Sequence, residues 1–202
     1  GLGAPLRGSP ARTPRRAHVQ LARPSWDTVR AIHDALAARR PIALLHPKLP
    51  PTELARQRAI LDGADLPAGT AVVLFTSGST GPARGVALSR GALEAAAAAS
   101  AAHLGWRDDD RWLLALSTAH AGGLAVVVRC YLAGAPIALL DGDFDRARCA
   151  ALLEQCTLAS LVPTQLLALL EDPAWRPPRS LRAVLLGGAA APPALLRAAS
   201  ER

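Results

Sequence analysis

Residues 71–86 read Ala-Val-Val-Leu-Phe-Thr-Ser-Gly-Ser-Thr-Gly-Pro-Ala-Arg-Gly-Val. The run begins with apolar residues that predict a buried strand and continues with residues rich in glycine and hydroxyl side chains. Glycine lets the backbone bend sharply and approach an anion, hydroxyl groups donate hydrogen bonds, and Arg84 adds a positive charge. The stretch therefore predicts a strand that leads into a phosphate-binding loop at residues 76–86.

The spacing within this loop differs from that of the P-loop nucleotide-binding proteins. Their pattern requires a glycine, a four-residue gap, a second glycine, a lysine and then serine or threonine. Counted from Gly78, the second glycine position holds Ala83. P-loop phosphoryl transfer is therefore disfavoured, and the alternative without function is a flexible glycine-rich turn between two strands.

The same run resembles the phosphate-binding signature of the adenylate-forming superfamily, which includes acyl-CoA synthetases, luciferases and peptide-synthetase adenylation domains. That signature is Thr-Ser-Gly-Ser/Thr-Thr-Gly-x-Pro-Lys-Gly-Val. Residues 76–81, Gly85 and Val86 match it, whereas Ala83 and Arg84 stand where the family has proline and lysine. The resemblance implies that ATP is bound by Thr76, Ser77, Gly78, Ser79, Thr80, Gly81, Arg84 and Gly85.

A histidine-containing segment after the loop extends the resemblance. Residues 116–124 read Leu-Ser-Thr-Ala-His-Ala-Gly-Gly-Leu and resemble the family's Pro-x-x-His-x-x-Gly motif, with Thr118 and Ala119 replacing the proline and the aromatic residue. In the family this histidine lies beside the acyl pocket and the reacting carboxylate. The resemblance implies that His120 contacts the acid and that His120 and Arg84 are catalytic; the alternative for His120 is an ordinary polar loop residue.

Two later segments are most similar to the 2-succinylbenzoate–CoA ligases of menaquinone biosynthesis. They are residues 161–167, Leu-Val-Pro-Thr-Gln-Leu-Leu, and residues 185–192, Leu-Leu-Gly-Gly-Ala-Ala-Ala-Pro. In those enzymes the Gly-Gly segment lies against the acyl group and the adenine. The resemblance implies that Gly187, Gly188 and Ala189 bind nucleotide and that Thr164, Gly187 and Gly188 contact substrate; a strand-to-helix turn is the alternative.

Periodicity and capping residues predict an α/β fold. From residue 112 onward strands alternate with helices, which favours βαβ units and a parallel sheet. With the resemblance, this predicts mixed and parallel sheets flanked by helices, as part of the N-terminal domain of an adenylate-forming enzyme. Helices are expected at 25–39, 51–61, 89–104, 124–132, 145–155, 163–171 and 192–200, and strands at 42–45, 71–75, 86–88, 112–116, 136–140, 158–162 and 181–186.

The domain organisation follows from the same comparison. Residues 1–24 are rich in arginine and proline and predict a disordered leader, and residues 25–202 are expected to form a partial AMP-binding N-terminal domain. The chain contains no methionine and stops before the family's Tyr-Gly-x-Thr-Glu motif, its ribose-binding aspartate and its mobile C-terminal domain. We therefore expect a fragment, without the C-terminal domain, that is inactive alone.

The amino-acid composition disfavours several classes of function. The net charge is +7, but most of the excess lies in residues 1–70 and the aromatic content is 3%, which disfavours nucleic-acid binding. The scattered cysteines and histidines predict reduced, buried thiols and no metal site. Since neither a membrane span nor a secretory signal is visible, the expected location is the cytoplasm.

The resemblance implies ATP-dependent activation of a carboxylic acid to acyl-AMP and then to acyl-CoA, most specifically by a 2-succinylbenzoate–CoA ligase. The implied ligands are the acid, ATP, Mg²⁺ and CoA, and a homo-oligomer is a further expectation. Two alternatives stay open. One is a ligase or adenylation domain for another carboxylic acid, and the other is a truncated, non-catalytic module that binds nucleotide.

Overall fold

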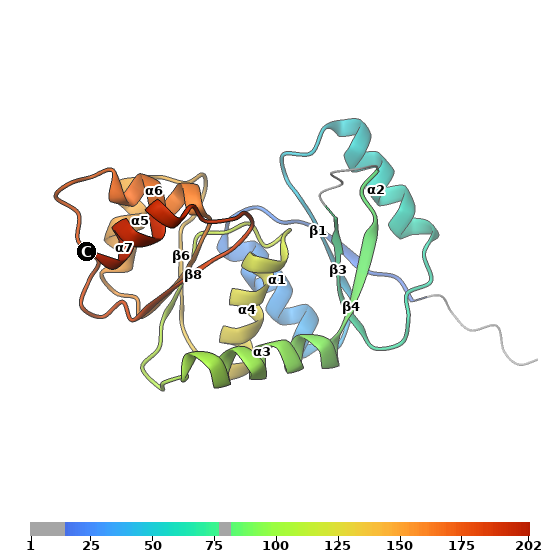
Figure 1. Cartoon of the computed structure of the whole chain (residues 1–202). Coiled ribbons are helices and arrows are strands. Elements are labelled where there is room, and N and C mark those ends of the chain that lie inside the picture. The colour runs from blue at the N-terminus through green and yellow to red at the C-terminus, as the bar shows by residue number, and fades with distance from the viewer. Residues whose placement is uncertain (1–14, 77–81) are drawn as a thin grey trace, which may run out of the picture.

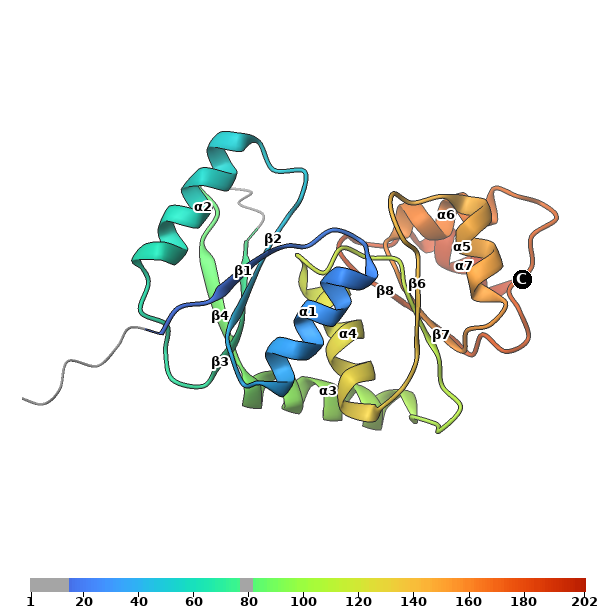
Figure 2. The ribbon, with the colours of Figure 1, turned by 180° about the vertical axis from the view of Figure 1, so that it is seen from behind.

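The computed structural model describes residues 15–76 and 82–202, and its strands form two four-stranded sheets (Figure 1). Three helical layers enclose them. Helix α2 covers the outer face of the first sheet, α1 and α4 lie between the sheets, and α5, α6 and α7 cover the outer face of the second (Figures 1 and 2). The predicted fold class, α/β with mixed and parallel sheets flanked by helices, is confirmed.

The first sheet has the order β1-β2-β3-β4, parallel except for the antiparallel β3–β4 hairpin. Its side chains alternate between two apolar clusters, as expected for a sheet buried on both faces. Ile42 and Leu44 join the cluster between the sheets, whereas Ala43 and Leu45 pack with Leu61 beneath α2. The elements are β1 (His18–Leu21), α1 (Trp26–Ala37), β2 (Ile42–Leu45), α2 (Pro51–Gly63), β3 (Thr70–Phe75) and β4 (Gly85–Ser89).

Residues 18–24 correct the predicted leader. His18–Leu21 form β1, which pairs in parallel with Ile42–Leu45, and Ala22 is fully buried. Because arginines and prolines surround this short segment, its sequence does not predict a strand. The free edge of β2 supplies the backbone hydrogen-bond partners that make it one. Residues 1–14 lie outside the described part of the chain.

The second sheet is entirely parallel, with the order β6-β5-β7-β8. Trp112 and Leu114 face the cluster between the sheets, and Leu113 faces the helices on the outer side. Each crossover helix returns the chain to the same end of the sheet, as βαβ units require. The elements are α3 (Arg90–Leu104), β5 (Trp112–Leu114), α4 (Ala121–Ala133), β6 (Ile137–Leu139), α5 (Arg146–Leu153), β7 (Leu158–Leu161), α6 (Pro163–Leu170), β8 (Ala183–Leu186) and α7 (Pro193–Ser200).

Local capping signals account for several helix ends. Ser25 and Ser89 accept hydrogen bonds from the amides of Thr28 and Ala92, and so begin α1 and α3 as predicted. Gly134, with a φ of 66°, ends α4. These helix ends therefore follow from residues within one turn of the boundary.

The start of α4 differs from the prediction, which placed it at Leu124. The helix begins at Ala121 with His120 as its N-cap residue. A Cβ at Gly123 would lie 2.3 Å from the carbonyl oxygen of Ser117, so only glycine permits this close approach of the helix to the preceding loop. Gly123, which reads as a loop residue, is therefore a packing residue within the first turn of the helix.

The three cysteines are unpaired and buried, as predicted. Burial raises the pKa of the Cys130 thiol to about 12 and of the Cys149 and Cys156 thiols to about 11, so all three are protonated at neutral pH. Among the helices of the described residues, none combines the length and hydropathy that a membrane span requires.

A buried ion pair ties the second sheet to the end of α3. Asp110, whose side chain is fully buried, accepts hydrogen bonds from the guanidinium of Arg182, from Thr157 Oγ1 at 2.6 Å and from the Arg107 amide at 2.9 Å. Arg182 also donates to the carbonyl of Leu104 at 2.6 Å. Burial acts to raise the pKa of Asp110, but the hydrogen bonds, first that from Arg182, lower it to about 2.

This shift predicts acid-dependent stability. The pKa of Asp110 is lower in the folded chain than its ordinary value of 3.8, so the stabilisation is complete above that value and is lost as the pH falls toward 2. The expected loss is about 2 kcal/mol. Urea unfolding between pH 5 and pH 2 measures it, and Asp110→Asn should flatten that part of the profile. If the free energy of unfolding of the wild-type chain and of Asp110→Asn fell equally steeply with pH, the lowered pKa would not belong to Asp110.

Candidate active site

A cleft of about 460 Å³ lies where β2 and β3 end, between α2 and the start of α4. In parallel sheets the carboxyl ends of strands are the usual place for ligands, because loops from several strands meet there. The cleft joins elements that are distant in sequence and places His120 beside both ends of the phosphate-loop motif. Its lining consists of Leu44, His46, Leu49, Glu53, Gln57, Phe75, Thr76, Pro82, Ala83, Ala119 and His120.

Thr76 and Arg84 close the base of the predicted phosphate loop. The Thr76 amide donates to the Arg84 carbonyl at 3.0 Å, and the Arg84 amide donates to Thr76 Oγ1 at 3.0 Å. These bonds continue the β3–β4 ladder beyond the pairing of Phe75 with Gly85. Thr76 thus supports the loop with its oxygen while its hydroxyl hydrogen remains able to donate.

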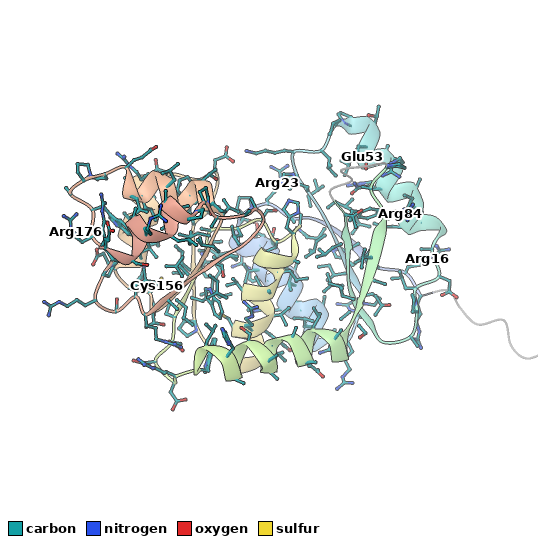
Figure 3. The ribbon with its side chains drawn as sticks, viewed as in Figure 1. Arg16, Arg23, Glu53, Arg84, Cys156 and Arg176 are labelled. Carbon is teal, nitrogen blue, oxygen red and sulfur yellow. The ribbon has the colours of Figure 1, made fainter. Side chains whose placement is uncertain are left out.

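The Arg84 side chain is exposed beside the loop, and no hydrogen bond or ion pair of its guanidinium is seen within residues 15–76 and 82–202. Arg84 directly precedes β4, and Figure 3 shows it close to α2, which carries Glu53. An uncommitted guanidinium at this place can bind phosphate oxygens in two-point fashion. The predicted ligands Ser77, Gly78, Ser79, Thr80 and Gly81 lie outside the described residues.

His120 faces a second histidine across the cleft. The ring centroids of His46 and His120 are 5.4 Å apart, and the two rings are tilted by 42°. The Lys48 amide donates to His46 Nδ1 at 3.2 Å, which assigns the proton of neutral His46 to Nε2. Burial, followed by the charges of His120 and Lys48, lowers the pKa of His46. His46 therefore presents a neutral imidazole group to the cleft at neutral pH.

Sequence reasoning gave His46 no role. It lies directly after the predicted strand at residues 42–45, and its position at the carboxyl end of a strand next to the loop strand was the available signal. What the sequence lacked was the register of β2 against β3, which pairs Leu44 with Leu74 and so brings His46 to the loop.

The other predicted substrate residues lie apart from this cleft. Thr164, Gly188 and Ala189 line a separate, mostly apolar cavity of about 770 Å³ between α6 and α7. Gly187 donates its amide to the Leu161 carbonyl at 3.2 Å, and Gly188 has a φ of 80°. The structure therefore brings together His120, Thr76 and the flanks of the loop, and it places the Gly-Gly turn at the end of the neighbouring sheet.

Comparison with known proteins identifies the family. The AMP-binding enzyme family matches residues 18–202, so the chain belongs to that family. A 2-succinylbenzoate–CoA ligase of Bacillus pumilus (strain SAFR-032) is 38% identical over 135 residues, which are 66% of this chain and 27% of the relative. The enzyme of that name from Bacillus cereus (strain ATCC 14579) is 40% identical over 134 residues, or 64% and 27% of the two chains.

Solved structures agree with this assignment. An O-succinylbenzoate coenzyme A synthetase of Bacillus subtilis, in complex with ATP and magnesium ion, matches with a TM-score of 0.81 and 26% identity over 92% of this chain and 47% of that one. The same enzyme in complex with AMP gives a TM-score of 0.79. The resemblance to adenylate-forming enzymes is confirmed. The chain spans about a quarter of the length of these curated relatives.

Proposed function

We propose that this chain is part of an AMP-forming acid–CoA ligase, with 2-succinylbenzoate as its acid. The observation that carries the proposal is the cleft in which His120 meets both flanks of the phosphate-loop motif, in a chain that belongs to the AMP-binding family. The choice of acid rests on the names of the relatives that are 38% and 40% identical. Because the reaction uses ATP and CoA, a cytoplasmic location is part of the proposal.

The proposed chemistry has two displacements. A carboxylate oxygen of the acid attacks the α-phosphorus of ATP, which forms acyl-AMP and releases pyrophosphate. The thiolate of CoA then attacks the acyl carbonyl, which forms the thioester and releases AMP. In the first step both reactants are anions, so catalysis depends on positioning and on neutralising charge.

The described residues fit a triphosphate that brings its own Mg²⁺. Arg84 and the loop are assigned to the β- and γ-phosphates, and Mg²⁺ would neutralise the charge that remains. The carboxylate of Glu53, which lines the cleft, accepts hydrogen bonds from Arg56 and Gln57. His120, with His46 beside it, is assigned to the carboxylate of the acid.

Isotope exchange between ATP and pyrophosphate tests this function. The gene product at its full encoded length should catalyse exchange only when 2-succinylbenzoate is added, and should form the CoA thioester when CoA is also present. The 202-residue chain alone should bind Mg·ATP without sustained pyrophosphate release. Exchange with benzoate or succinate at an equal rate would reject the assigned acid, and no exchange with any acid would reject the ligase assignment.

His120→Ala is expected to act on the acid rather than on ATP. The value of kcat/KM for the acid should fall by about tenfold or more, because a hydrogen bond to a charged group is lost, while the KM for ATP stays nearly constant. Steady-state kinetics with each substrate varied in turn measures the two effects. His103→Ala, an exposed change on α3, serves as the control. Equal, small effects on both substrates would return His120 to the role of an ordinary polar residue.

A further inference from the structure

Arg56 connects α2 to the phosphate-loop motif. Its Nη2 donates to the carbonyl oxygen of Ala83 at 2.8 Å. The next residue, Arg84, is held by its amide bond to Thr76 Oγ1. Two consecutive residues at the C-terminal side of the loop are therefore fixed from different elements, one from α2 and one from the β3–β4 hairpin.

Two neighbours on α2 fix the orientation of Arg56. Its Nε and Nη2 each donate to a carboxylate oxygen of Glu53 at 2.7 Å, and Gln57 Nε2 donates to Glu53 Oε1 at 2.7 Å. A planar guanidinium that bonds a carboxylate through two nitrogens keeps a single orientation. Hydrogen bonds from Arg56 and Gln57 lower the pKa of Glu53 to about 2, so this carboxylate is ionised at neutral pH.

The network formed by Glu53, Arg56 and Gln57 has a different role from that of Arg84, because its charges are balanced within it. Glu53 and Gln57 line the cleft, where an unbalanced carboxylate would repel a triphosphate. Arg56 balances that charge, since it forms an ion pair with Glu53 at 2.7 Å. The guanidinium of Arg84, in contrast, is exposed and uncommitted within the described residues. The network thus acts on the loop through a backbone carbonyl, whereas Arg84 supplies positive charge.

Ala83 is one of the two positions at which the loop departs from the family signature, which has proline there. A proline ring fixes φ near −65°, and alanine leaves that dihedral free. Alanine therefore costs more conformational entropy to hold in one loop geometry. A hydrogen bond to the carbonyl of Ala83 provides from outside the restraint that the ring would provide within the residue.

We propose that Arg56, oriented by Glu53 and Gln57, is a positioning residue that holds Ala83 and Arg84, the C-terminal flank of the phosphate-loop motif, in the geometry used for binding. The proposal rests on the proposed function for what the loop binds, namely a triphosphate. The hydrogen bond from Arg56 compensates for the absence of a proline at position 83, so Arg56 is needed because residue 83 is alanine.

Hydrogen–deuterium exchange tests the positioning itself. In the full chain, Arg56→Ala should speed exchange of the Arg84 amide by about tenfold, because the residue before it is released. Arg58→Ala removes the same charge from an exposed site on α2 and should leave that amide unchanged. Glu53→Gln, a milder change that loosens the Arg56 fork, should act in the same direction with a smaller effect. An unchanged Arg84 amide in both Arg56→Ala and Glu53→Gln would overturn the proposal.

Affinity for Mg²⁺-bound inorganic tripolyphosphate provides the second measurement. Arg56→Ala should raise its dissociation constant by about tenfold, Arg58→Ala should not, and Ala83→Pro added to Arg56→Ala should restore part of the affinity, because it restrains residue 83 but leaves the Glu53 charge unbalanced. Equal weakening by Arg56→Ala and Arg58→Ala, or no rescue by Ala83→Pro, would overturn the compensation. If the wild-type chain binds neither tripolyphosphate nor Mg·ATP, the proposed function fails, and the exchange measurement still decides whether Arg56 holds the loop.

Discussion

Arg182→Ala is expected to lower the free energy of unfolding by about 3–5 kcal/mol, because it leaves a buried carboxylate without its partner. The Asp110 side chain is fully buried and the Arg182 side chain is 17% exposed. The same substitution also removes the donor that satisfies the carbonyl of Leu104 at the end of α3. Urea unfolding followed by circular dichroism measures the change.

Two controls isolate the ion pair. Arg179→Ala removes an arginine from an exposed position just before β8 and should change stability by less than about 0.5 kcal/mol. Combining Arg182→Ala with Asp110→Asn should recover part of the loss, because no charge is then buried unpaired. If Arg182→Ala is no more destabilising than Arg179→Ala, the ion pair contributes nothing to the fold.

Arg84→Ala is expected to slow ATP–pyrophosphate exchange by about 10- to 150-fold in the gene product at its full encoded length, as the loss of one charge-assisted hydrogen bond predicts. The kinetic constants for ATP should change and the KM for the acid should not, since the side chain is assigned to triphosphate oxygens. Arg84→Lys, which restores the residue of the family signature, should keep most of the activity. An exchange rate unchanged by Arg84→Ala would remove Arg84 from the site.

The Asp110–Arg182 pair also shows how sequence and structure differ in what they reveal. The sequence indicates an acidic turn at residues 108–110, and the turn is present. It does not distinguish Asp110, which is buried, from its exposed neighbours Asp108 and Asp109. The distinction comes from Arg182, which approaches only because β8 pairs with β7 in the second sheet.

The candidate site likewise contains residues that the sequence indicates and residues that only the folded structure indicates. His120 and the loop residues were predicted from motifs, because the chemistry proposed for them lies in short runs of sequence. Arg56 and His46 were missed, since each acquires a role only through a partner brought close by folding: the Ala83 carbonyl for Arg56 and the His120 ring for His46. A motif search does not register an arginine whose target is a backbone oxygen.

The sequence by itself determined the local features of this protein: the two paired strands β3 and β4, the serine caps of α1 and α3, and membership of a family that the phosphate-loop motif indicates. Tertiary structure decided the rest, including β1 at the edge of the first sheet and the cleft between α2 and α4. The reason is the range of the interactions. Caps and turns are set by residues within one turn of each other, whereas edge pairing and long-range hydrogen bonds need partners that only the folded chain brings together.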